Sequence, residues 1–240
     1  MPRRTKTQAL GQHFLADRKV LDRIIDAADI GSDEVVCEAG TGNGVLTQEL
    51  CKRARQVLSY EVDKILFQRS TQSLRFPNLQ MVNADLFKVR RRDIKFDVFC
   101  SNLPYSKSRD ALQWLATKKF DRAIVMVQQE FADKLAARPG SENYRAISAI
   151  CSHCFKIEQL FAVSPEAFEP PPKVNSAVLR LIPVNAATTS FITKINRLFS
   201  QRNKRASSVA AKMGATINFG NLRVDQLEPG QLAMLAGLIK

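Results

Sequence analysis

The chain has 240 residues, of which 45% are hydrophobic, and it carries a formal net charge of +13. This length suffices for one α/β domain with a small appendage and for a core that needs no disulfide or metal to stabilise it. Since no apolar run approaches the ~20 residues of a membrane span and no signal-peptide core is present, we expect a cytoplasmic protein without a membrane partner.

The positive charge is concentrated at the two ends of the chain. Residues 1–23 contribute +4 and residues 186–240 contribute +6, which leaves +3 for the residues between them. Basic ends around a near-neutral middle favour a polyanion held near an active centre. The alternative is that basic tails only solvate the surface.

Five cysteines without a secretory signal indicate reduced thiols rather than a disulfide framework. Cys151 and Cys154 bracket His153 at a spacing that metal sites use. A structural zinc site needs four ligands, however, and the chain has no second cysteine pair or histidine cluster. We therefore expect buried helical cysteines and no metal.

The first predicted element is a helix that follows a basic N-terminal segment. Asp17 is a suitable N-cap, and apolar residues recur at helical spacing from Val20 to Ala28, so we expect the helix to end near Asp29. His13 lies just ahead of this helix and is either a ligand or a surface imidazole.

Three glycines at alternate positions follow a valine-rich run that begins at Val35. An amphipathic run follows Gly40, Gly42 and Gly44, so the pattern predicts a strand, a tight loop and a helix. Such glycines allow positive φ and close approach of a ligand, and the first turn of the helix has unpaired amides. We interpret this loop as a nucleotide cradle.

The glycine spacing distinguishes between two nucleotide ligands. A dinucleotide fingerprint requires its third glycine at position 45, which is Val45 here, and an acid, Glu38, precedes the loop. Glu61 ends the next apolar run and places a carboxylate where ribose hydroxyls need acceptors. An adenosyl ligand fits, with S-adenosyl-L-methionine the obvious candidate; the alternative is a glycine turn beside a solvated glutamate.

Two further strands end in polar residues. The strand from Leu79 leads to Asp85, which is either an acceptor for an adenine amino group or a turn-forming aspartate. The strand from Phe96 stops at Asn102-Leu-Pro-Tyr105, in which the proline restricts the backbone and the tyrosine offers an aromatic face. That combination suits a base flipped out of its stack.

The remaining patterns predict alternating helices and strands. We expect helices over 64–74, 108–119, 130–138, 146–154, 191–199 and around 232–238, and strands over 123–128, 157–163 and 177–182. Phe168 lies in a stiff proline loop and is expected to be exposed, or else to be a hydrophobic staple of the loop.

Alternation of strands and helices from residue 35 to residue 128 predicts a doubly wound parallel sheet. Ligands of such sheets bind outside the carboxyl ends of the strands. The glycine loop, Glu61, Asp85 and Asn102 all fall at these ends, so we expect one site there.

With these motifs, the chain resembles the ribosomal RNA adenine dimethyltransferase family. The segments that match occur in the family's order over roughly residues 8–183: they are 12–15, 38–47, 61–63, 83–85, 102–105, 126–130 and 168–176. The resemblance implies a seven-stranded, mostly parallel Rossmann-like methyltransferase sheet over residues 1–184 and a small, basic, helical RNA-binding domain over 185–240.

The resemblance also implies roles for individual residues. Cofactor contacts are expected from Gln12, His13, Leu15, Glu38, Gly40, Gly42, Glu61, Asp85 and Asn102. Catalytic roles are expected for Asn102, Leu103, Pro104, Tyr105 and Phe168. RNA contacts are expected from Arg3, Arg4, Lys6, Lys107, Arg109, Arg202, Lys204 and Arg205.

The implied chemistry is an in-line attack of the adenine amino nitrogen on the sulfonium methyl group. Because the nitrogen lone pair is delocalised into the ring, the enzyme must hold it in a reactive geometry. The Asn102 oxygen and the Leu103 backbone carbonyl could accept its hydrogens, while Tyr105 and Phe168 stack on the extruded base. The family methylates the same nitrogen twice.

We therefore expect a dimethyltransferase that acts on two adjacent adenosines near the 3' end of small-subunit ribosomal RNA during ribosome biogenesis. Its partners would be that RNA and the pre-ribosomal small-subunit particle, and the protein would act as a monomer. One alternative is a large-subunit methylase of the macrolide-resistance type. The other is a non-catalytic assembly or transcription factor on the same fold.

Overall fold

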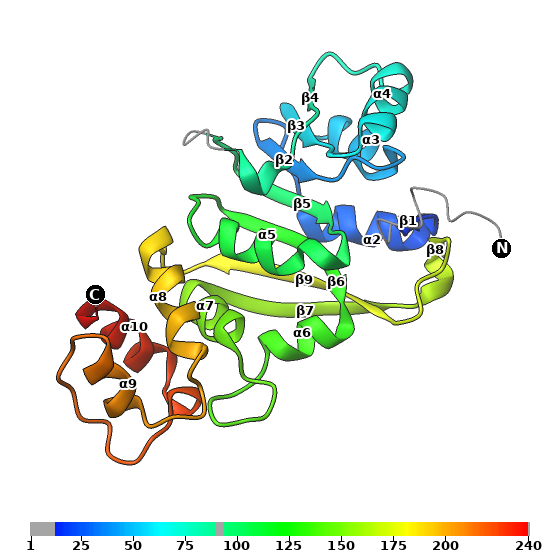
Figure 1. Cartoon of the computed structure of the whole chain (residues 1–240). Helices are drawn as coiled ribbons and strands as arrows, with labels where there is room; N and C mark the ends of the chain where they lie inside the picture. The colour runs from blue at the N-terminus through cyan, green and yellow to red at the C-terminus, as the bar shows by residue number, and fades with distance from the viewer. Residues whose placement is uncertain (1–12, 90–93, 240) are drawn as a thin grey trace. The chain divides into compact units, whose positions relative to one another are not determined.

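The computed structural model describes residues 13–89 and 94–239 (Figure 1). Its contacts divide the chain into two compact units. The first comprises Met1–Ala111, Lys119–Gln129 and Glu158–Ile182; the second comprises Leu112–Lys118, Glu130–Ile157 and Pro183–Lys240. Within the described ranges, no helix is both long and apolar enough to cross a membrane. The domain boundary at residue 184 stays a prediction.

A seven-stranded sheet forms the centre of the fold, as predicted. Its strands are arranged in the order β4-β3-β2-β5-β6-β9-β7, and Figure 1 shows helices on both of its faces. The first five of these strands pair in parallel, whereas β9 is antiparallel to β6. The bounds are β2 Val35–Ala39, β3 Gln56–Tyr60, β4 Leu79–Val82, β5 Val98–Asn102, β6 Arg122–Gln128, β7 Phe155–Val163 and β9 Ser176–Pro183.

The central strands are almost continuously apolar because they are covered on both faces. In β6 only the first and last residues are partly exposed, and β2, β5 and β6 together supply much of the buried core. This burial fixes the register of the sheet, and the parallel register brings the carboxyl ends of β2, β3, β4 and β5 to one edge.

The helices of the first unit begin where the sequence indicates. Helix α2 (Arg18–Ala28) starts after Asp17, whose carboxylate accepts hydrogen bonds from the next turn, and its apolar side packs into the core. Asp63 caps α4 (Lys64–Ser73) in the same way, and α3 (Val45–Cys51) follows the glycine loop. Helix α5 (Ser108–Leu115) ends before the predicted Lys119, in a turn.

A two-stranded sheet that the sequence did not reveal joins distant segments. β1 (Phe14–Leu15) pairs antiparallel with β8 (Phe168–Glu169), so that Leu15 lies opposite Phe168. Phe168 is only 4% exposed and packs in the main apolar cluster. The prediction that Phe168 is exposed was therefore wrong, because strand pairing turns the proline loop back against the core.

The second unit is mainly helical, and three of its helices pack on one another. It contains α7 (Ala146–Cys154), α8 (Thr189–Phe199), α9 (Ala206–Lys212) and α10 (Pro229–Leu238), together with α6 (Gln129–Leu135) from Glu130 onward and the last four residues of α5. α7, α8 and α10 pack mutually, and Tyr144 lies edge-on to Phe199 with ring centroids 5.6 Å apart. This packing joins residues 130–157 to the C-terminal helices in one compact unit.

All five cysteines lie in the described ranges and are buried, and no disulfide joins them. His153, which lies between Cys151 and Cys154, places its ring 5.0 Å from that of Phe191, and burial lowers its pKa. Over residues 13–89 and 94–239, no group of His, Cys, Asp or Glu side chains is arranged to hold a metal ion.

Candidate functional site

A pocket opens at the carboxyl ends of the parallel strands, entirely within the first unit. Its walls come from the β1 segment, the glycine loop after β2, the ends of β3 and β4, the segment after β5, and β8. The residues that line it are His13, Phe14, Leu15, Ile24, Ala39, Gly40, Thr41, Gly42, Asn43, Val45, Leu46, Tyr60, Glu61, Val62, Ala84, Asp85, Leu86, Phe87, Asn102, Leu103, Pro104, Tyr105, Lys107 and Phe168. The four predicted strand ends thus do meet at one site.

Two glycines of the loop are required by its backbone. Gly40 has φ 86° and Gly42 has φ 55°, a region that strains other residues. A Cβ on Gly42 would come within 3.2 Å of the Phe14 ring. The loop therefore lies against β1 with its backbone toward the pocket, as a nucleotide cradle requires.

Glu61 is held by backbone amides at the end of β3. Its Oε2 accepts a hydrogen bond from the Gly42 amide at 3.0 Å, and its Oε1 accepts one from the Asp63 amide at 2.8 Å. The side chain is nearly buried and lines the pocket. Each carboxylate oxygen retains a lone pair, so Glu61 can still accept hydrogen bonds from a pair of ligand hydroxyls.

Glu38 lies behind the glycine loop and is not among the residues that line the pocket. It is fully buried, and its Oε2 accepts hydrogen bonds from the hydroxyls of Ser59 at 2.6 Å and Thr47 at 2.7 Å. Its Oε1 has no partner in the part of the chain that the structure describes. Burial raises the pKa of Glu38 to about 7, and the nearby Glu61 charge adds to this effect. The geometry gives Glu38 a supporting position rather than the predicted direct contact.

Asp85 is held at the end of β4 by two different donors. Its Oδ1 accepts a hydrogen bond from the Phe87 amide at 3.1 Å, which caps a short 3-10 helix, η1 (Leu86–Lys88). Its Oδ2 lies 3.1 Å from the Lys107 ammonium group. Hydrogen bonding to Asp85 raises the pKa of Lys107. Lys107, predicted to contact RNA, is thus engaged inside the pocket wall.

The segment after β5 is fixed by contacts with residues far away in the chain. The Asn102 amide donates to the His13 carbonyl at 3.4 Å, which leaves its oxygen as the acceptor of the group. Leu103 is buried, and Pro104 precedes a second 3-10 helix, η2 (Tyr105–Lys107). The Tyr105 hydroxyl bonds to Ser176 Oγ at 2.8 Å, and burial raises the pKa of Tyr105.

His13 is oriented by the loop that carries Phe168. Its Nδ1 lies 2.7 Å from the Pro170 carbonyl oxygen, and because a carbonyl only accepts, Nδ1 carries the proton. The ring lies 5.7 Å from that of Tyr105, measured between centroids. His13 therefore lines the pocket, which favours a contact with a ligand over an isolated surface imidazole.

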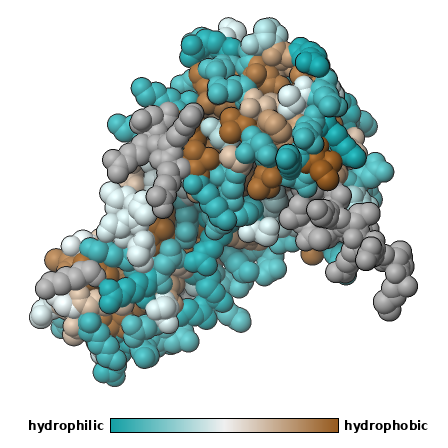
Figure 2. All heavy atoms as spheres, turned by 45° about the horizontal axis from the view of Figure 1, so that its top comes forward, coloured by the Kyte–Doolittle hydropathy of each residue, from teal (hydrophilic) through white to brown (hydrophobic). Residues whose placement is uncertain are grey.

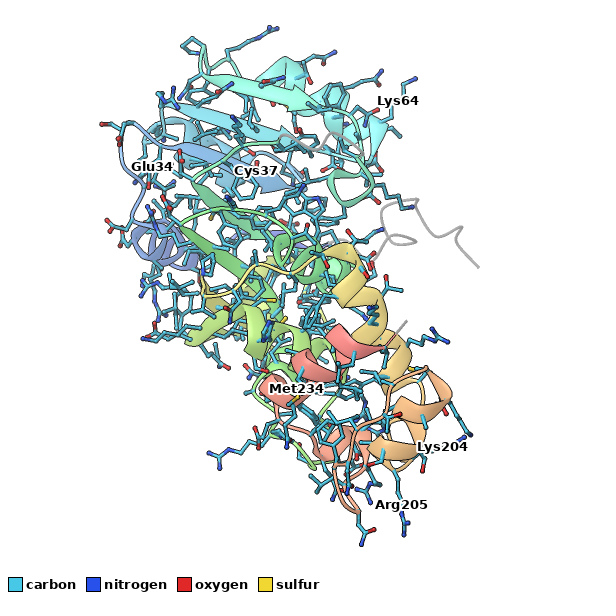
Figure 3. All side chains as sticks on the ribbon, turned by 90° about the vertical axis from the view of Figure 1, so that its left-hand side faces the viewer. Glu34, Cys37, Lys64, Lys204, Arg205 and Met234 are labelled. Carbon is cyan, nitrogen blue, oxygen red and sulfur yellow. The ribbon has the colours of Figure 1, made fainter. Side chains whose placement is uncertain are left out.

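The basic residues predicted to contact RNA occupy different environments. Lys204 and Arg205 are exposed in the second unit, and Figure 3 shows both side chains extending away from its ribbon. Arg202 instead donates to the carbonyls of Glu142 and Tyr144, each at 3.3 Å. Arg109 is exposed in the first unit. Arg3, Arg4, Lys6 and the predicted cofactor residue Gln12 lie outside the described residues.

Several pocket residues were not anticipated from the sequence. Val45 and Val62 line the pocket although they are 39% and 60% exposed, and Figure 2 shows apolar side chains reaching the surface among hydrophilic ones. Ser59 and Thr41, whose hydroxyls lie 2.6 Å apart, link Glu38 to the loop. Val62 directly follows Glu61 at the end of β3, and this position next to a predicted ligand residue could have indicated that Val62 lines the pocket.

A family model described as ribosomal RNA adenine dimethylase matches residues 3–224. The probable ribosomal RNA small subunit methyltransferase A of Methanococcus aeolicus is 31% identical over 229 residues, covering 92% of this chain and 84% of that protein. The ribosomal RNA small subunit methyltransferase A of Bacillus cereus is 34% identical over 214 residues, covering 82% and 73%.

Two solved structures are also similar to this chain. A dimethyladenosine transferase from Plasmodium falciparum aligns with a TM-score of 0.79 at 24% identity, over 95% of this chain and 99% of that one, which shows the shared fold. The 23S rRNA methyltransferase ErmE aligns with a TM-score of 0.64 at 27% identity, over 94% and 99%.

Proposed function

The chain belongs to the ribosomal RNA adenine dimethylase family, and from this membership we propose that it is an S-adenosyl-L-methionine-dependent rRNA (adenine-N6,N6)-dimethyltransferase. Its substrate would be two adjacent adenosines near the 3' end of small-subunit ribosomal RNA, modified during ribosome biogenesis. One observation carries the proposal: the glycine loop, Glu61, Asp85 and the segment from Asn102 to Tyr105 line a single pocket.

The acceptor groups of the pocket match the hydroxyl and amino donors of an adenosyl cofactor. Glu61 and Asp85 line the pocket, so Glu61 would accept hydrogen bonds from ribose hydroxyls and Asp85 would accept one from the adenine amino group. The backbone of Gly40 and Gly42, free of side chains, allows close approach. When bound, S-adenosyl-L-methionine supplies an electrophilic methyl group on its sulfonium sulfur.

The residues after β5 would activate the target nitrogen. The Asn102 carbonyl oxygen and the Leu103 backbone carbonyl would accept hydrogen bonds from the amino group, which favours the pyramidal form of the nitrogen and directs its lone pair at the methyl group. As the N–C bond forms, the bond from the methyl carbon to the sulfonium sulfur would break, and the nitrogen would lose one proton to solvent. Because the Asn102 amide is bound to the His13 carbonyl and Leu103 is buried, these acceptors are held before the substrate arrives. No covalent bond to the enzyme is required.

Aromatic side chains would hold the extruded base. Tyr105 lines the pocket with its hydroxyl bound to Ser176, and Phe168 lines it from β8. Stacking on aromatic rings is worth ~1–3 kcal/mol per base. The monomethylated base would have to re-enter the same pocket for the second transfer.

The second unit would supply part of the RNA-binding surface. Lys204 and Arg205 are exposed there and can meet backbone phosphates, which position an RNA without reading its sequence (Figure 3). We assign Arg202 a mainly structural role, because it binds two backbone carbonyls. The protein would act as a monomer on the small-subunit particle.

Transfer of labelled methyl groups tests the proposal. The protein is incubated with labelled S-adenosyl-L-methionine and small-subunit particles, large-subunit particles or naked RNA, and the nucleosides are then analysed. We expect N6,N6-dimethyladenosine in the small-subunit particles. Label only in large-subunit RNA would establish the large-subunit methylase, and cofactor binding without transfer to any substrate would establish a binding factor.

A further inference from the structure

The Asp85–Lys107 ion pair spans the pocket between two parts of the sheet that are not neighbours. Asp85 follows β4 and Lys107 follows β5, and strands β3 and β2 separate these two in the sheet. The pair therefore crosses the carboxyl edge of the sheet, where the pocket lies, and both residues line the pocket. It connects the predicted adenine acceptor with the segment that carries Asn102 and Tyr105.

Both side chains of the Asp85–Lys107 ion pair are partly buried, unlike those of ordinary surface ion pairs. The Asp85 side chain is 16% exposed and that of Lys107 is 32% exposed, and their charged atoms are 3.1 Å apart. Lys88 also approaches Asp85, but at 3.9 Å and with 76% exposure, so solvent screens it far more. Lys107 is thus both closer to Asp85 and more buried than Lys88.

The bridge leaves Asp85 able to accept another hydrogen bond. Its Oδ1 is bound to the Phe87 amide and its Oδ2 to Lys107, whereas a carboxylate has about four acceptor positions. Covering Asp85 with a base removes water from a charged group, which costs free energy unless a cation stays beside it. Among the residues that the structure describes, Lys107 is the cation whose ammonium group lies at hydrogen-bond distance from Asp85.

We propose that Lys107 is a positioning residue: it holds and neutralises the Asp85 carboxylate in the orientation that accepts the amino group of the cofactor's adenine. The inference rests on the proposed function, because it assigns the adenosyl end of the cofactor to Asp85. It also gives Lys107 a role other than the RNA contact expected from the sequence. Selectivity for adenine is then a joint property of Asp85 and Lys107.

Calorimetric titration with two ligands tests this role without a turnover assay. The ligands are S-adenosylhomocysteine and its analogue in which the 6-amino group of the purine is replaced by hydrogen. The wild-type protein should prefer the first by about 10-fold, as expected for one hydrogen bond to a charged acceptor. Lys107→Met should reduce this preference to about 2-fold, and Lys107→Arg, which keeps the cation, should restore most of it.

Lys88→Met is the matched control, since it removes a cation near the same carboxylate from an exposed position. It should change the preference by less than 2-fold. An unchanged 10-fold preference in Lys107→Met, or a preference that increases, would overturn the positioning role and leave the proposed function intact. Failure of the wild-type protein to bind S-adenosylhomocysteine would instead overturn both.

Discussion

The two walls of the pocket are built in different ways. The glycine-loop wall is held by residues close together in the chain: Glu61 binds amides at 42 and 63, and Glu38 binds hydroxyls at 47 and 59. The wall around Asn102 is held by remote partners, since Asn102 reaches His13, 89 residues away, and Tyr105 reaches Ser176, 71 residues away. The long contacts of the glycine-loop wall therefore span 19 to 21 residues, whereas the wall around Asn102 forms only when segments 71 to 89 residues apart come together.

The largest expected effect is on the rate of methyl transfer, and it distinguishes the wall around Asn102 from the glycine-loop wall. Asn102→Ala should lower the single-turnover rate of methyl transfer by about 100-fold or more, as expected when a group that acts in the transition state is removed. Binding of S-adenosylhomocysteine, measured by calorimetry, should weaken far less. Asn203→Ala, at an exposed position of the second unit, is the control. Equal losses of rate and affinity would mean that both walls serve the cofactor.

The pH dependence of stability should reveal the buried carboxyl of Glu38 behind the glycine-loop wall. The pKa of Glu38 is raised from 4.5 to about 7 by burial. The folded state therefore disfavours the charged form of Glu38, which lowers the free energy of unfolding. This loss of stability is absent below about pH 4.5, grows as the pH rises to about 7 and is constant above. Chemical denaturation should show Glu38→Gln gaining stability relative to wild type across this window, by up to about 3 kcal/mol.

Glu34→Gln is the control of opposite sign. Its pKa is lowered by hydrogen bonding to Arg122, so its stabilising contribution is present above the unfolded pKa and is lost as the pH falls. Figure 3 labels Glu34, which precedes β2. If Glu38→Gln followed wild type in parallel between pH 4.5 and 7, Glu38 would have the same pKa in the folded and unfolded states, and burial would not raise it.

The glycine loop should be sensitive to a single methyl group. Gly42→Ala places a Cβ at φ 55° and 3.2 Å from the Phe14 ring, so we expect a loss of about 1–2 kcal/mol in stability together with weaker S-adenosylhomocysteine binding. Gly237→Ala, in α10 with open space around the added Cβ, should instead be neutral or stabilising. Thermal unfolding and calorimetry measure both. Undiminished binding by Gly42→Ala would contradict close approach of the ligand.

The smallest effect should come from the hydroxyl of Tyr105. Tyr105→Phe keeps the ring and removes the bond to Ser176, so stability should fall by about 1 kcal/mol and methyl transfer by only a few-fold. Tyr105→Leu should reduce transfer much more, because the stacking face is lost. Equal activity of the two variants in the methyl-transfer assay would show that Tyr105 does not stack on the target base.

The sequence predicted the parallel sheet, the strand ends that form the site and most helix starts. These features depend on local signals: Asp17 and Asp63 cap the helices that follow them, and the alternate glycines mark the loop between a strand and a helix. Glu61 and Asp85 were correctly predicted to follow strands, because each strand is a short apolar run and a polar residue marks where it ends.

Other features were decided by tertiary structure alone. Whether Phe168 is exposed, whether Glu38 faces the ligand and whether Lys107 meets RNA or Asp85 all depend on segments that approach only in the folded chain. A residue type specifies what a side chain can bind, whereas burial and partners specify what it does bind. The sequence by itself therefore determined the class of fold and the types of side chain that meet at the strand ends. Only the packing of distant segments determined which groups are charged, covered or paired.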